Sequence, residues 1–290
     1  MSGLLAHGTF DNRLLAVGTF DTIANLLKVK SGLSIGPDKL YLLDTRLARI
    51  LKRYELPNLN ALAERLRGVR AETLTQEVVE AMTTNESLFF RDDKPFEHFR
   101  TQALPRFHAA RPPGTKLRVW SAASSSGQEA YSLAMILTDM RASLGDRQVE
   151  IIGTDISREQ LTRAREGLYT QFEVQRGLPM QMLVKHFRKE AAGWRVAEAI
   201  RRMVEFREWN LLVDLRPLGR FDIVFCRNVL IYFDQPTKAR TLEAIAALLP
   251  PDGLLYLGGA ETVLGITTRL APIAGARGVY GLAGAMVGAL

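Results

Sequence analysis

The chain has 290 residues, 47% hydrophobic and 24% charged, which is the composition of a globular protein long enough for a catalytic domain and a smaller second domain. Its net charge of +7 indicates acidic partners, and nucleic acid, an anionic membrane surface and a glutamate-rich protein are all compatible with it. Cys226 is the only cysteine, which excludes an intramolecular disulfide and a thiolate metal cluster, and the four histidines lack the spacing of metal ligands.

Charged residues interrupt every apolar stretch before it reaches the length of a bilayer span. The N-terminus also lacks a basic region that leads into an apolar, signal-like core. The sequence therefore predicts a cytoplasmic protein without direct membrane insertion.

The N-terminal part of the chain has the pattern of short helices. Residues 1–20 are expected to be a disordered extension, and residues 21–85 a small helical domain. Gly32, Pro37 and Pro57 would separate its helices. The apolar side chains that would form its core are Leu26, Leu27, Leu33, Leu40, Leu42, Leu43, Leu47 and Ile50.

Basic side chains crowd the polar face of this helical domain. They are Lys28, Lys30, Lys39, Arg46, Arg49, Lys52 and Arg53. Such a run is most often a solvated helix surface. The density of positive charge also fits a docking face for an acidic partner, and the residues alone leave both interpretations open.

Residues 117–155 have the pattern of half a nucleotide-binding βαβ unit. A strand at 117–120 leads through a turn to a helix at 128–140, and a second strand ends at Asp155. The turn reads AASSSG at 122–127 and lacks the glycine pattern of dinucleotide sites, so that a pyrophosphate is not expected on the following helix. Small side chains let a ligand approach the backbone closely. The turn therefore favours a cofactor with a small neutral tail.

Asp155 has two interpretations. An acidic residue at the end of the second strand of such a unit commonly accepts hydrogen bonds from both ribose hydroxyls, which indicates an adenosine-type ligand. The alternative is that it caps the helix expected at residues 157–166. Because Ser157 can serve as that cap, we favour the ligand role for Asp155.

Strands continue to alternate with helices toward the C-terminus. They are predicted at residues 117–120, 149–154, 204–208, 221–227 and 253–258, with helices after the first, second and fourth. This alternation predicts a mainly parallel sheet with helices on both faces. Asp155, Asn210 and Asn228 lie at or just past the carboxyl ends of strands, where such sheets bind ligands, and they should converge on one crevice. Cys226 lies in an apolar strand and is predicted to be a buried small hydrophobe.

Three blocks of residues together resemble one protein family. They are TTNESLFFR at residues 83–91, WSAASSSGQEAYS at 120–132 and FDIVFCRNVLIYFD at 221–234. In this order they strongly resemble the chemotaxis receptor methyltransferases of the CheR family, from about Phe20 to Tyr280. The resemblance implies an α/β fold: a Rossmann-like S-adenosylmethionine-dependent methyltransferase sheet, a small N-terminal all-helical domain and a small antiparallel β subdomain.

The resemblance also implies how the chain is divided. Residues 86–116 would form a linker and a helix that covers the site, and residues 117–290 the methyltransferase domain. The small β subdomain is expected at about 190–208, with strands at 193–196 and 203–207.

The activity implied by the resemblance is transfer of the methyl group of S-adenosylmethionine to glutamate side chains of chemotaxis receptors. The products would be glutamate methyl esters, used in sensory adaptation, and S-adenosylhomocysteine. A glutamate with an ordinary pKa of about 4.3 is already ionised at neutral pH, so no general base and no catalytic dyad are expected.

By resemblance, two residues have catalytic roles, Arg91 and Tyr232. The cofactor-binding residues are Asn85, Ser87, Arg91, Glu129, Asp155, Asn210, Leu211, Arg227 and Asn228. Arg91 either pairs with the cofactor carboxylate or orients the incoming glutamate. Tyr232 either lines the glutamate channel or packs with its hydroxyl in water.

The cofactor-binding residues are assigned to different parts of the ligand. Asn85, Ser87 and Arg91 would lie at the methionine end, near the methyl group. Glu129 would hold the amino group, although a glutamate in a first helical turn also complements the helix dipole. Asn210 and Leu211 would flank the adenine, with Arg227 and Asn228 beneath the cofactor. Phe89 and Phe90 are expected to be packing groups.

Two rival functions are less consistent with the residues. A nucleic-acid or amine methyltransferase typically has Asn or Asp, then Pro-Pro and an aromatic residue after the fourth strand, whereas Asn228 is followed by VLIY. A silent sensor would have lost site residues, but Arg91, Glu129, Asp155 and Asn228 are all present.

The expected partner is thus the cytoplasmic helical bundle of methyl-accepting chemotaxis receptors, and not nucleic acid. A single glycine in residues 187–193 argues against tethering of a receptor's C-terminal pentapeptide through a glycine-rich loop. We expect a monomer.

Overall fold

The computed structural model describes residues 16–285 and divides the chain into two compact units, with the division between Thr84 and Asn85. The extension expected at residues 1–20 therefore lies mostly outside the described residues. Within residues 16–285, none of the helices combines the length and the apolar character that a membrane span needs.

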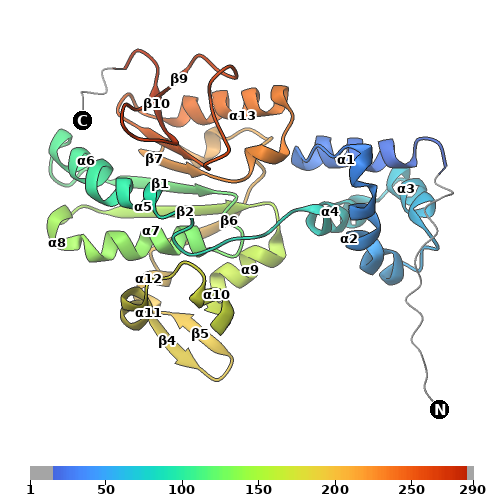
Figure 1. Cartoon of the computed structure of the whole chain (residues 1–290), viewed down its shortest axis with the longest axis horizontal. Helices are drawn as coiled ribbons and strands as arrows, with labels where there is room; N and C mark the ends of the chain where they lie inside the picture. The colour runs from blue at the N-terminus through green and yellow to red at the C-terminus, as the bar shows by residue number, and fades with distance from the viewer. Residues whose placement is uncertain (1–15, 286–290) are drawn as a thin grey trace. The chain divides into compact units, whose positions relative to one another are not determined.

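The first unit is built from helices (Figure 1). They are α1 Thr19–Ser31, the short 3₁₀ helix η2 Pro37–Lys39, α2 Leu40–Arg53, α3 Leu59–Arg67 and α4 Glu72–Met82. Gly18 and Gly32 adopt left-handed conformations at the two ends of α1, and Asn58 caps α3 by accepting a hydrogen bond from the Ala61 N–H. The fully buried core includes Ile23, Leu27, Leu43, Leu47, Leu62 and Val78.

Arg46 has a structural role inside this unit. Its Nη1 donates to the carbonyl oxygens of Met82 at 2.6 Å and Thr83 at 3.1 Å, and its Nη2 donates to the Thr84 hydroxyl at 3.1 Å. It thereby satisfies carbonyl groups at the C-terminal end of α4. Arg46 is therefore not simply part of a solvated basic face.

The second unit contains a seven-stranded sheet of order β6-β2-β1-β7-β8-β10-β9. The strands are β1 Leu117–Ala122, β2 Val149–Asp155, β6 Val204–Glu208, β7 Ile223–Cys226, β8 Leu254–Leu257, β9 Leu270–Pro272 and β10 Val279–Leu282. The first five in spatial order are parallel, which confirms the predicted parallel sheet. The antiparallel pair β9 and β10 was not predicted from the sequence.

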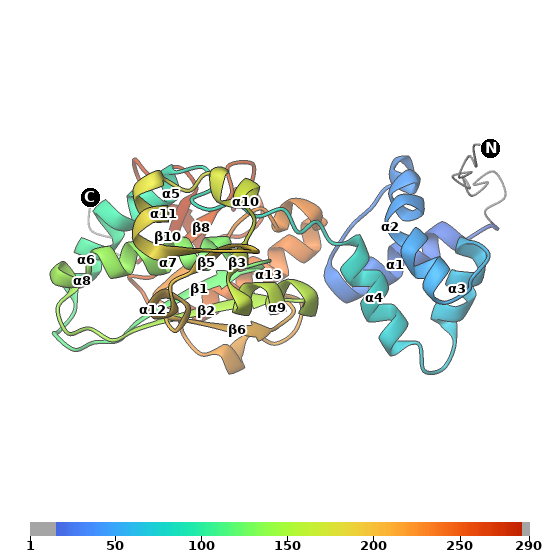
Figure 2. The ribbon, with the colours of Figure 1, turned by 90° about the horizontal axis from the view of Figure 1, so that it is seen from below.

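Helices cover both faces of this sheet (Figures 1 and 2). They are α5 Lys94–His98, the π-helical segment η3 Phe99–Ala103, α6 Leu104–Ala110, α7 Gln128–Asp139, α8 Arg141–Leu144, α9 Arg158–Glu166, α12 Glu198–Arg201 and α13 Gln235–Leu248. Two 3₁₀ helices, η4 Arg216–Leu218 and η5 Leu230–Tyr232, lie in the loops. Alternate residues of β1 enter opposite cores: Val119 packs in the cluster that includes α7, and Trp120 in the cluster that includes α13.

A separate three-stranded antiparallel sheet of order β3-β5-β4 follows α9. It consists of β3 Leu168–Tyr169, β4 Phe187–Glu190 and β5 Gly193–Val196, accompanied by α10 Gln171–Gln175 and α11 Met180–His186. The strand expected at 193–196 is confirmed. The expected strand at 203–207 is wrong for this subdomain, because residues 204–208 form β6 and pair with β2 along five positions, burying Val204 and Phe206.

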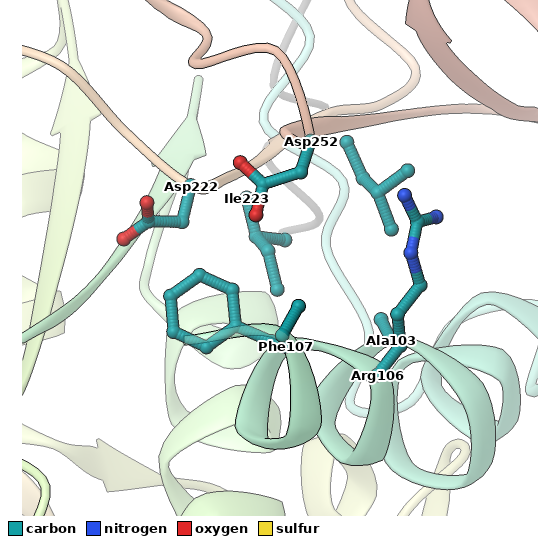
Figure 3. A pocket seen from close by; sticks show the side chains of 8 residues that line it. Ala103, Arg106, Phe107, Asp222, Ile223 and Asp252 are labelled. Carbon is teal, nitrogen blue, oxygen red and sulfur yellow. The ribbon is translucent and has the colours of Figure 1, made fainter. Parts of the chain in front are cut away.

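Arg111 joins the amino ends of β7 and β8. Its Nη1 lies 2.6 Å from Asp222, and its Nε and Nη2 bind the Asp252 carboxylate at 2.9 and 2.6 Å. A cavity of about 10 Å³ lies beside these two aspartates and is also lined by Phe107 and Arg106 (Figure 3). This region lies at the opposite edge of the sheet from the carboxyl ends of the parallel strands.

Candidate functional site

The predicted site residues gather at the carboxyl ends of four parallel strands. The turn at residues 122–127 follows β1, Asp155 is the last residue of β2, Asn210 follows β6, and Arg227 follows β7. Since β1 lies between β2 and β7, the chain connections diverge here, which is where open α/β sheets bind ligands.

The turn after β1 has an uncommon backbone conformation. Ala123, Ser125 and Gly127 have φ values of 56°, 50° and 94°, all in the left-handed region. A Cβ on Gly127 would come within 3.0 Å of the Phe206 ring, so glycine is required there by both space and conformation. The Ser125 N–H donates to the Asp155 carboxylate at 2.8 Å, which fixes the turn to the end of β2.

Asp155 is 8% exposed and binds backbone on both sides. One carboxylate oxygen accepts from Ser125, and the other accepts from the Ser157 N–H at 2.9 Å. Ser157 itself caps α9 by accepting from the Gln160 N–H, which confirms the predicted cap. Ser157 rather than Asp155 is therefore the N-cap of α9, and the Asp155 carboxylate joins the turn after β1 to the start of that helix.

Glu129 and Arg227 form an ion pair in the centre of the site. One Glu129 oxygen accepts from the Ser121 hydroxyl at 2.8 Å, and the other lies 3.2 Å from Arg227 Nη1. Burial raises the pKa of Glu129, and the Arg227 charge opposes this shift. The Arg227 side chain is only 1% exposed, and its Nη2 also donates to the Arg91 carbonyl at 2.8 Å and to Asp92 at 2.7 Å.

The segment at residues 85–93 is attached to the turn and to α7. The Asn85 carbonyl accepts from the Ser125 hydroxyl at 3.0 Å, and the Phe90 N–H donates to the Ser132 hydroxyl at 3.0 Å. Phe89 and Phe90 are buried, at 0% and 7% exposure, which confirms that they are packing groups.

The ends of this segment are held by polar contacts. Arg176 forms an ion pair with Glu86 at 3.0 Å, and Arg91 Nη1 donates to the Glu86 carbonyl at 3.3 Å. The Arg91 side chain is only half-buried. Its carbonyl accepts from Arg227, and its guanidinium donates back to Glu86 within the same segment.

The loop after β7 is held by a residue that the sequence did not single out. The Glu261 carboxylate accepts four backbone N–H groups, from Asn228 at 2.8 Å, Val229 at 3.0 Å, Ile231 at 3.2 Å and Gly258 at 2.7 Å. Glu261 is 9% exposed. An acidic residue in a loop 33 positions after Asn228 gives no sequence signal for this role.

Asn210 and Leu211 lie beside Asp155. The Trp209 N–H donates to the Asp155 carbonyl at 3.0 Å, and the Asn210 side chain accepts from the Leu212 N–H at 2.9 Å, which forms a local turn. Leu211 is 8% exposed. The two residues thus adjoin the end of β2.

Ser87 and Tyr232 are less closely tied to this centre. Both are half-buried, Ser87 in the 85–93 segment and Tyr232 at the end of η5. Within the described residues, the side-chain partners of Glu129 and Arg227 are Ser121, Arg91, Asp92 and each other, and include neither Ser87 nor Tyr232.

Backbone strain concentrates in this region. In residues 16–285, eight non-glycine residues have positive φ. Six of them belong to the segments described above: Phe90, Asp92, Asp93, Ala123, Ser125 and Asn228. Such conformations cost free energy and persist where surrounding contacts hold them, which is typical of ligand sites.

No cluster of His, Cys, Asp and Glu that could hold a metal ion occurs within the described residues. Cys226 is fully buried, and burial raises the pKa of its thiol well above the ordinary value. This confirms the prediction that Cys226 is a small hydrophobic group.

Comparison with known proteins gives matches over both units. Residues 18–83 match the family model described as CheR methyltransferase, all-alpha domain, and residues 85–279 match CheR methyltransferase, SAM binding domain. The chemotaxis protein methyltransferase Cher2 of Pseudomonas putida is 40% identical over 251 residues, covering 85% of this chain and 91% of that protein. Chemotaxis protein methyltransferase 1 of Pseudomonas aeruginosa is 41% identical, covering 84% and 90%, and that of Vibrio cholerae is 38% identical, covering 84% and 88%.

Proposed function

The chain belongs to the CheR methyltransferase family, and we propose that it transfers the methyl group of S-adenosylmethionine to glutamate side chains of chemotaxis receptors. The products are glutamate methyl esters and S-adenosylhomocysteine. The observation that carries this proposal is the match of both units to the family, with the SAM-binding match spanning every segment of the candidate site up to Gly258 and Glu261.

The residues at the carboxyl edge fit S-adenosylmethionine. Glu129 offers a buried carboxylate whose charge suits the amino group, and Asp155 lies where such folds bind ribose hydroxyls. Ser124 Oγ and Trp209 Nε1 are buried without a hydrogen-bond partner in the described part of the chain, which supports a polar ligand at this edge.

The remaining proposed contacts are assigned to different parts of the ligand. Those at the methionine end are Asn85, Ser87 and Arg91; those at the adenine are Asn210 and Leu211; those beneath the cofactor are Arg227 and Asn228. The contacts of Arg227 with the Arg91 carbonyl and the Asp92 carboxylate support a role in holding the 85–93 segment over the cofactor.

The reaction needs positioning more than proton transfer. When bound, the cofactor supplies an electrophilic methyl group on a sulfonium. The receptor glutamate is already a carboxylate at neutral pH, so the protein need not remove a proton from it. Attack of a carboxylate on a sulfonium neutralises charge, and a water-poor site therefore favours it. Arg91 orients one of the reacting partners, and Tyr232 lines the path of the glutamate.

The basic residues of the helical unit provide the docking face for the acidic receptor bundle. On α2, the exposed side chains at helical spacing are Tyr41, Thr45, Arg49, Lys52 and Arg53. Arg46 is occupied with the end of α4 and contributes less to this face. The loop between β4 and β5 consists of two alanines. This supports receptor recognition without a glycine-rich loop that tethers a receptor peptide.

The proposal is tested by incubating the protein with methyl-labelled S-adenosylmethionine and membranes that contain its receptors. We expect label on the receptor band that is lost on mild base treatment, as esters are. The Arg91→Ala variant serves as the matched control. Base-stable label would instead indicate methylation of an amine, and no label on receptors would refute the proposed substrate.

A further inference from the structure

We propose that the Tyr169 hydroxyl is a positioning group for the cofactor, through which the small antiparallel sheet holds the turn at residues 122–127 in its binding conformation. This inference rests on the proposed function, because it assumes that the turn contacts S-adenosylmethionine. It assigns a task at the methyl-donor site to a residue of β3.

The contact joins two parts of the fold. Tyr169 is 1% exposed, and its hydroxyl donates to the Ser126 carbonyl at 2.6 Å. Ser126 lies between Ser125 and Gly127, both left-handed. Burial raises the pKa of Tyr169 well above its ordinary value, so that the hydroxyl remains a hydrogen-bond donor at neutral pH.

Two hydrogen bonds determine how the peptide plane between Ser126 and Gly127 is oriented. The Gly127 N–H donates to the Ser124 carbonyl at 2.9 Å, and the Ser126 carbonyl accepts from Tyr169. The contacts with Asp155 and Asn85 hold Ser125 but not this plane. Because glycine rotates more freely than any other residue, loss of the Tyr169 bond would let the turn adopt other conformations.

Tyr169 is itself held rigidly. Its ring packs edge-on against Phe89, with ring centroids 4.9 Å apart, and its backbone pairs with Trp194 of β5. A Cβ on Gly193 would come within 2.3 Å of the Tyr169 carbonyl, so the close approach of these strands requires glycine. The hydroxyl is therefore presented to the turn from a fixed support.

Tyr131 provides a matched control in the same aromatic cluster. Its ring centroid lies 6.4 Å from that of Tyr169, and it is also 1% exposed. Its hydroxyl donates to the Ala164 carbonyl, likewise at 2.6 Å. The two hydroxyls thus each donate one short bond to a backbone carbonyl, but only the Tyr169 hydroxyl binds the turn. Tyr131 contacts Gly127 through its backbone N–H and its ring, and Tyr131→Phe retains both.

The experiment measures S-adenosylhomocysteine binding to the full chain by titration calorimetry, for the wild type, Tyr169→Phe and Tyr131→Phe. We expect about five- to tenfold weaker binding for Tyr169→Phe, the effect of one buried hydrogen bond. Binding by Tyr131→Phe should stay within about twofold of wild type, although both variants lose a similar bond and unfold at similarly lowered temperatures. The Michaelis constant for S-adenosylmethionine should rise with little change in kcat.

A second measurement concerns the turn directly. Without cofactor, amide hydrogen exchange at residues 124–127 should accelerate in Tyr169→Phe and not in Tyr131→Phe. Equal effects of the two variants, or unchanged affinity in Tyr169→Phe, would overturn the inference. Absence of binding by the wild type would instead refute the proposed function.

Discussion

Replacing Glu261 with alanine removes the carboxylate that accepts the N–H groups of Asn228, Val229, Ile231 and Gly258. Gly258 is buried and Asn228 lies against it, so these two donors would be left unpaired at about 1–3 kcal/mol each. The other two belong to a partly exposed loop, where water can replace the carboxylate. We therefore expect the free energy of unfolding to fall by about 3–5 kcal/mol.

The Glu261→Gln variant refines this expectation. Glutamine retains the shape of the glutamate side chain, but its NH2 group is a hydrogen-bond donor and would face two backbone N–H donors. The free energy of unfolding should therefore still fall by about 2–3 kcal/mol. Urea unfolding at neutral pH measures both values. The control is Glu198→Gln, which removes an ion pair with Arg202 from a side chain that is 63% exposed and should cost no more than about 0.5 kcal/mol. A loss below about 1 kcal/mol for Glu261→Ala would show that the carboxylate does not hold this loop.

Three further variants test the proposed site and docking face. Asp155→Asn should weaken S-adenosylhomocysteine binding at least about tenfold, since charge-assisted ribose bonds are lost, and unchanged calorimetric affinity would remove Asp155 from the site. Arg91→Ala should lower the rate of receptor methylation about a hundredfold, because either proposed role positions a reacting partner, and near-normal turnover would contradict both. Reversal of Arg49, Lys52 and Arg53 to glutamate should raise the Michaelis constant for the receptor and flatten its salt dependence, since charges are screened within about 8 Å at physiological salt. Cofactor affinity should not change, and an unaltered salt profile would identify these residues as solvated surface.

Local patterns predicted the part of the fold that contains the turn. The two strands and the helix at residues 117–155 each have a clear hydrophobic period, and a turn of small residues joins the first strand to the helix. The structure forms β1, α7 and β2 there. Only the boundaries differ, because β1 continues to Ala122 and α7 ends at Asp139. β3 has two residues, too few for any hydrophobic period to show, and Tyr169 could therefore not be predicted as a strand residue.

Contacts between distant segments could not be predicted. Arg46 was grouped with neighbouring basic residues, but its partners lie 36 to 38 residues away at the end of α4. The same holds for Glu261, whose four partners come from two loops. Composition and spacing describe what a side chain can bind, whereas the fold decides which groups reach it.

The two edge strands of the large sheet also limit unwanted association with other chains. Directly after β6 the Trp209 N–H bonds to Asp155 of β2, so that Phe206 of β6 directs its carbonyl outward. Arg165 of α9 donates to this carbonyl at 2.8 Å. At the other edge the Ile273 N–H bonds toward β10, which leaves Pro272 facing outward at a position where proline has no N–H to offer. Neither edge thus presents a continuous row of backbone groups, and a further strand would find a poor template for addition or for aggregation.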